Sequence, residues 1–144
     1  MSATYRIYLE TDLNRVFSQS LGPIAVAELD VVLTFGLGAP GTSIEEVTEG
    51  RTAYLRFAFS GDRGELVSAV AGLSSAAALF VEHSPASLEP LPFVDGLAFG
   101  TELATTQRYK GKTSERLTRL MLGVAQATDG SKAPDRSLVD PMCG

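Results

Sequence analysis

The fold is decided by the stretch SIEEVTEGRTAYLRFAFS, residues 43–60. In its second half an apolar residue stands at every second position: Ala53, Leu55, Phe57 and Phe59. An alternation with a period of two is typical of a β-strand with one apolar face. Gly50 separates this segment from residues 43–49, so the two segments predict a β-hairpin.

The segment after the hairpin predicts a helix and then a strand. Asp62 suits the N-cap position, and Glu65 follows three residues later. Apolar residues then recur at helical spacing: Leu66, Val67, Val70 and Leu73. Residues 76–83, AAALFVEH, are short, apolar and compatible with a strand.

The segments before the hairpin predict one more strand and one more helix. Residues 4–10, TYRIYLE, alternate with β-favouring side chains on one side. Pro23 suits the first position of a helix that runs to about Val32. The element order is therefore β-α-β-β-α-β, so we predict an α+β fold with a ferredoxin-like domain over residues 1–84.

The composition excludes several classes of protein. With 44% hydrophobic and 20% charged residues, the chain is expected to form a packed core. No run of apolar residues is long enough to span a membrane, and the N-terminus lacks a signal-peptide pattern, so we expect a cytoplasmic protein without membrane contact. The single cysteine and single histidine predict neither an internal disulfide nor a metal site.

His83 lies at the end of a predicted strand and invites an acid–base role. The sequence offers it no neighbouring carboxylate except that of Glu82, whose side chain would point to the opposite face of the strand. We therefore expect no catalytic role for His83.

Prolines mark the end of the first domain. Three of the seven prolines, Pro85, Pro90 and Pro92, fall within residues 84–92, which predicts an extended connector. Residues 85–100 are therefore interpreted as a linker, and residues 101–144 as the start of a second domain.

The second segment differs in charge from the first. Residues 1–100 carry 5 basic and 12 acidic residues, whereas residues 101–144 carry 7 basic and 5 acidic residues. Basic residues gather in RYKGKTSERLTRLMLGVAQA, residues 108–127, which predicts a helix with Thr113 as N-cap. Its expected buried residues are Leu117, Leu120, Met121, Val124 and Ala125. The basic face is either simply solvated or approaches an anionic ligand, and spacing alone does not choose.

Residues 137–144, SLVDPMCG, combine a short apolar strand, an acidic residue and a glycine, which is typical of the opening of a Rossmann-like nucleotide site. This segment resembles the DPxCGxGT motif of amino-methyltransferases that act on exocyclic nitrogens of nucleobases. Together with RYKGKT at 108–113 it looks most like RNA methyltransferases of the guanosine-N2 type, which modify tRNA or rRNA. The resemblance implies that residues 101–144 begin a truncated Rossmann-like methyltransferase domain and that residues 1–84 position the RNA.

The resemblance also implies roles for individual residues. S-adenosylmethionine, the cofactor of the complete enzyme, would be contacted by Asp140, Pro141, Cys143 and Gly144, and by a second group, Tyr109, Lys112 and Thr113. RNA would be contacted by Arg108, Lys110 and Arg116. The family's Asn/Asp-Pro-Pro-aromatic loop does not occur in the sequence, so no catalytic residue is assigned and the chain alone is expected to bind or position rather than catalyse.

Plainer interpretations stay open for these residues. Asp140 could cap a turn, Cys143 could be a small packing residue, and Lys112 and Thr113 could be a surface residue and an N-cap. The whole chain could instead be a stand-alone ferredoxin-like binding module that forms a homo-oligomer through an open sheet face, or a fragment of a DNA amino-methyltransferase.

Overall fold

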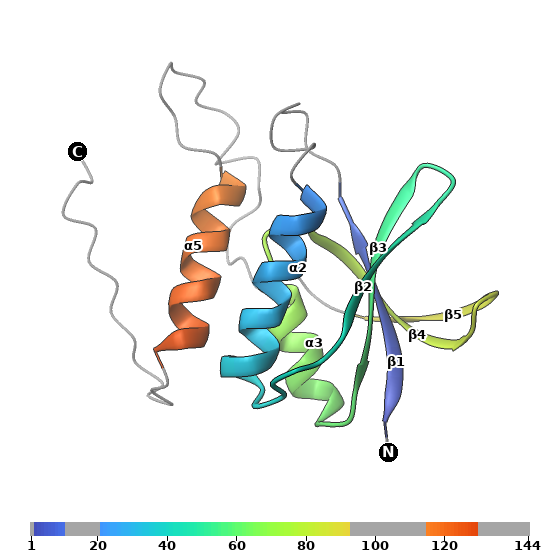
Figure 1. Ribbon diagram of the computed structural model, residues 1–144, viewed down its shortest axis with the longest axis horizontal. Coiled ribbons are helices and arrows are strands. Elements are labelled where there is room, and N and C mark those ends of the chain that lie inside the picture. Colours follow the sequence, from blue (N-terminus) through green and yellow to red (C-terminus); the bar gives the residue numbers. More distant parts are fainter. Residues whose placement is uncertain (1, 11–20, 93–114, 130–144) are drawn as a thin grey trace.

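A computed structural model describes residues 2–10, 21–92 and 115–129 of the chain (Figure 1). Within these residues the elements follow in the order β1 (Ala3–Leu9), α2 (Leu21–Val31), the π-helix η1 (Val32–Gly36), β2 (Ile44–Glu49), β3 (Thr52–Phe59), α3 (Arg63–Ala71), β4 (Ala76–Ser84), β5 (Ser87–Leu91) and α5 (Glu115–Thr128). The order β-α-β-β-α-β over residues 3–84 is the one that the sequence predicts.

The strands form one antiparallel sheet in the order β2-β3-β1-β4-β5. Helices α2, α3 and α5 all lie on the same side of it, with α5 outermost (Figure 1). The predicted hairpin joins β2 to β3 through Gly50, whose positive φ of 65° is a backbone conformation that glycine adopts without strain. One face of the sheet is therefore covered by helices, whereas the other has no helix over it among the described residues.

The core lies between the sheet and the helices. Alternate residues of the three central strands face the helices, as the period of two requires. They are Tyr5, Ile7 and Leu9 of β1, Leu55, Phe57 and Phe59 of β3, and Leu79 and Val81 of β4. The helix α3 begins as predicted, because the Asp62 Oδ1 atom accepts a hydrogen bond of 2.9 Å from the backbone N–H of Glu65. Leu66 and Val70 then anchor α3 in the core.

The segment interpreted as an extended connector contains the fifth strand. β5 pairs with β4, and Pro90 lies opposite Phe80 at the outer edge of the sheet. An edge strand tolerates proline, because the missing N–H leaves no ladder hydrogen bond unmade. The sheet thus extends beyond residue 84 to Leu91, which is buried. Residues 93–100 lie outside the described residues, so a linker there stays a prediction.

The helix α5 exposes residues that the sequence pattern assigns to the core. Leu117 and Met121 are 40% and 63% exposed, and Ala125 is exposed too, so this part of the burial prediction is wrong. The helix instead contacts α2 and η1, with Gly123 close to Glu28 and with Ala127 against the core. Small residues on that side let the two helices approach, whereas Leu117 and Met121 face outward and Leu120 and Val124 are half-buried. The predicted N-cap Thr113 lies outside the described residues.

None of the helices in the described ranges has both the length and the apolar character needed to cross a lipid bilayer.

Candidate functional site

Most residues that the sequence singles out lie outside the described ranges. This holds for Asp140, Pro141, Cys143 and Gly144, for Tyr109, Lys112 and Thr113, and for Arg108 and Lys110. Their assignment to cofactor and RNA stays a prediction. Of the named residues the structure places Arg116.

Arg116 anchors α5 to the end of β1. Its Nη1 atom donates a hydrogen bond of 2.6 Å to the backbone oxygen of Glu10, and its Nη2 atom lies 3.0 Å from the Glu10 carboxylate. The backbone N–H of Glu10 in turn donates to the carbonyl of Ser75, which precedes β4. Only 15% of the Arg116 side chain is exposed. The positive charge of Arg116 is therefore paired within the protein.

We expect the substitution Arg116→Ala to loosen α5 from the rest of the fold. The variant would lose one charge-assisted hydrogen bond and one ion pair, at a cost of about 1–2 kcal/mol. The cost is modest because one acceptor is a backbone carbonyl and the other, the Glu10 carboxylate, is exposed. Amide hydrogen exchange should then become roughly tenfold faster in residues 116–128, with little change in β1 and β3. Met121→Ala, at a 63% exposed position of the same helix, is the control, and an unchanged exchange rate in Arg116→Ala would exclude the anchoring role.

A second contact to α5 centres on Glu28, a carboxylate that is 2% exposed. Its oxygens accept hydrogen bonds from the backbone N–H of Ser74 at 2.9 Å and from the Ser74 hydroxyl at 2.6 Å. Burial raises the pKa of Glu28, while the Ser74 hydrogen bonds and the charge of Arg119 oppose that rise. Glu28 thus joins α2 to the turn between α3 and β4, beside α5.

Glu28 is not among the residues that the sequence singles out, although its position carries a signal. It follows Ala25 by three residues and precedes Val32 by four, so helical periodicity places it on the apolar face of α2. A single acidic residue on an apolar helix face indicates a buried carboxylate with dedicated donors.

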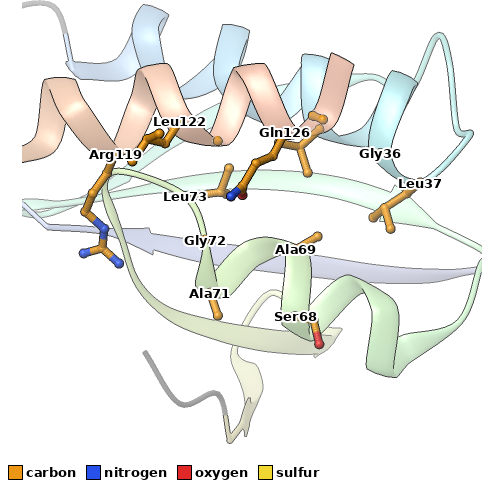
Figure 2. A pocket seen from close by; sticks show the side chains of 13 residues that line it. Gly36, Leu37, Ser68, Ala69, Ala71, Gly72, Leu73, Arg119, Leu122 and Gln126 are labelled. Carbon is orange, nitrogen blue, oxygen red and sulfur yellow. The ribbon is translucent and has the colours of Figure 1, made fainter. Parts of the chain in front are cut away.

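A cavity of about 520 Å³ lies between α3, η1 and α5 (Figure 2). Most of its wall is aliphatic or glycine, and three polar side chains, Ser68, Arg119 and Gln126, reach it from α3 and α5. Glu28 lies behind this wall, because a Cβ atom built on Gly123 would be 3.7 Å from the Glu28 Oε1 atom. The cavity is open to solvent, and its volume falls within the range of small-molecule pockets.

The sheet face turned away from the helices carries an ion-pair network. The Glu82 carboxylate accepts hydrogen bonds from Arg6 Nε at 2.7 Å and from Arg56 Nε at 2.9 Å. The two arginines also pair with Glu49 and Glu45, respectively. Arg6 and Glu82 are only 4% and 5% exposed, and the ring of Tyr54 lies against the Arg6 guanidinium.

The electrostatics of this network are unfavourable for nucleic acid. The hydrogen bonds from Arg56 and Arg6 lower the pKa of Glu82, so its carboxylate is ionised at neutral pH. The network therefore contains two arginines and three carboxylates, and both arginines are paired with these carboxylates. Since phosphate backbones require a positive surface, this face is not suited to bind RNA.

His83 has a carboxylate partner that the sequence analysis did not foresee. Its Nε2 atom lies 2.6 Å from the Glu89 carboxylate, because β5 folds back beside β4 instead of running on as a connector. Both side chains are more than half exposed, so the pair contributes little to stability.

Among the described residues there is no group of three His, Cys, Asp or Glu side chains arranged to hold a metal.

Comparison of the chain with protein-family models, with curated proteins and with solved structures finds no match in any of the three.

Proposed function

We propose that the chain is part of an S-adenosylmethionine-dependent RNA methyltransferase of the guanosine-N2 type. The observation that carries the proposal is the segment DPMCG at residues 140–144, preceded by RYKGKT at 108–113 and by an amphipathic helix between them. In this proposal Asp140, Cys143 and Gly144 hold the methionyl end of the cofactor, which supplies the methyl group.

The described domain supports the first half of the proposal. The antiparallel strand order β2-β3-β1-β4, with α2 and α3 on one face, is consistent with the ferredoxin-like domain of the proposal. In the proposal this domain positions RNA in front of a Rossmann-like catalytic domain that begins after residue 100. The proposal includes a cytoplasmic location.

The charges of the described residues indicate where RNA would approach. The uncovered sheet face carries the paired Arg6–Glu82–Arg56 network with its acidic partners, and Arg116 is held by Glu10. Contacts to phosphate are therefore assigned to Arg108 and Lys110, ahead of α5, rather than to the sheet.

The test is a calorimetric titration of S-adenosylmethionine into the full-length protein that its gene encodes. We expect micromolar binding, and a loss of at least about tenfold in the variant Asp140→Ala, because the motif aspartate organises the turn that meets the cofactor. Asp135→Ala, five residues earlier and outside the motif, is the matched control and should bind like the wild type. Absence of binding by the full-length wild-type protein would overturn the proposal.

A stand-alone binding module is the second candidate, and one observation favours it. Leu117 and Met121 lie on α5 with 40% and 63% of their surface exposed, as expected for a helix that meets a partner. A protein that does not bind S-adenosylmethionine and elutes as a stable dimer, with Met121→Ser reducing dimerisation, would select this alternative.

A further inference from the structure

The helix α5 carries an apolar stripe that is only partly buried. Four apolar side chains recur there at the spacing of one helix face: Leu117, Leu120, Met121 and Val124. Leu117 and Met121 are 40% and 63% exposed, and the other two are half-buried. An amphipathic helix buries such a stripe against an apolar partner, so these residues indicate a second packing surface on α5.

The apolar stripe lies beside the face of α5 that contacts the rest of the domain. On that face Arg116 pairs with Glu10. Gly123 approaches Glu28, and Ala127 packs against the core. At about 100° per residue, the contacting face and the stripe are centred about a quarter of a turn apart. Since α5 is the outermost helix (Figure 1), the stripe can meet a further element without displacing α2 or η1.

The segment that follows α5 in the chain has the right chemistry to cover the apolar stripe. Residues 137–142, SLVDPM, contain three apolar side chains, and the sequence predicts that they begin as a strand. Leu138 and Val139 point to opposite faces of such a strand. Either orientation of the strand therefore offers an apolar side chain to the helix.

The connection between α5 and this segment is long enough for the contact. Residues 129–136 reach up to about 27 Å when extended, whereas the 14 residues of α5 span roughly 21 Å. The segment can therefore lie anywhere along the stripe. Because it is tethered, its effective concentration is on the order of millimolar, far above that of a second copy of the chain in a micromolar solution. The tether thus favours the chain's own segment as the occupant.

We infer that residues 137–142 pack on the apolar stripe, so that α5 is shared between the sheet domain (residues 2–10 and 21–92) and the domain that begins with this segment. This contact rests on the proposed function in one respect, because it takes residues 137–142 as the first strand of the Rossmann-like domain. Strands of such a domain need helices on both faces, and α5 supplies one of them. The shared helix holds the DPMCG motif in a fixed position relative to the sheet domain.

The experiment is amide hydrogen exchange of the full-length protein that its gene encodes, without cofactor, in the wild type and in Met121→Asp. A charge in the apolar stripe should make exchange in residues 137–142 at least about tenfold faster and leave β1 and β3 unchanged. Leu117→Asp should have the same effect. The matched control is Ala125→Asp, which places the same charge one turn after Met121, at an exposed position outside the stripe, and should exchange like the wild type. Circular dichroism monitors folding.

Three results would overturn the contact: no protection of residues 137–142 in the wild type, unchanged protection in Met121→Asp, or a wild-type dimer that Met121→Asp dissociates. The last would assign the apolar stripe to a second copy. Titration with S-adenosylmethionine tests the proposed function separately. Binding of S-adenosylmethionine with unchanged exchange in Met121→Asp removes the contact alone, whereas faster exchange in a protein that does not bind S-adenosylmethionine removes the proposed function and leaves the contact standing.

Discussion

The variant Glu82→Ala is expected to unfold with a free energy about 3 kcal/mol lower than that of the wild type. Removing this carboxylate leaves Arg6, which is 4% exposed, and Arg56 facing each other without the anion between them. The value lies at the low end for broken buried pairs, because Arg6 keeps Glu49 as a partner. Urea unfolding followed by circular dichroism measures the difference.

The matched control is Glu89→Ala, which removes a carboxylate from the neighbouring strand. Its partner is His83, and both side chains are more than half exposed, so the cost should stay below about 1 kcal/mol. Equal losses in the two variants would show that the Arg6–Glu82–Arg56 network does not stabilise the sheet.

The stabilisation that Glu82 contributes also depends on pH and decreases under acidic conditions. Its pKa is lower in the folded protein than its usual value of 4.5, so the unfolded chain binds more protons as the pH falls. The stabilisation is fully present above about pH 4.5 and is lost as the pH falls through the folded pKa. The difference between wild type and Glu82→Ala should therefore shrink under acidic conditions.

The variant Glu28→Ala is expected to lose about 2–3 kcal/mol of unfolding free energy. The backbone N–H and the hydroxyl of Ser74 would both lose their acceptor in a buried site, and the missing side chain would leave a void beside α5. Glu28→Gln keeps an oxygen for the Ser74 N–H and should cost less than about 1 kcal/mol at neutral pH. Similar losses in both variants would argue against the hydrogen bonds as the source of the stability.

The pH dependence of Glu28 has the opposite sign to that of Glu82. Because burial raises its pKa above 4.5, the folded state favours the protonated form. Its contribution is fully present below about pH 4.5 and is lost as the pH rises through the folded pKa. Relative to the wild type, Glu28→Gln should thus gain stability as the pH rises above about 4.5 and through the folded pKa of Glu28, measured by urea unfolding at each pH.

Sequence by itself determined the elements whose signals are local. The alternation of Leu55, Phe57 and Phe59 predicts β3, and Asp62 with Glu65 predicts the start of α3, and the structure confirms both. Such signals depend on neighbours within one strand or one turn, so they are readable without knowing what lies across the sheet. The DPMCG resemblance is equally local, but it bears on residues outside the described ranges.

Tertiary structure alone decided the features that depend on distant partners. Pro90 belongs to a segment that the sequence predicts to be a connector. In the structure it lies in an edge strand beside β4, where a proline costs no ladder hydrogen bond. The contact between Arg116 and Glu10, 106 positions away in the chain, is another pairing that no pattern within one helix predicts. The exposure of Leu117 and Met121 was likewise decided by tertiary structure, because packing depends on the shape of the surface that the helix meets, which α5 approaches closely at Gly123.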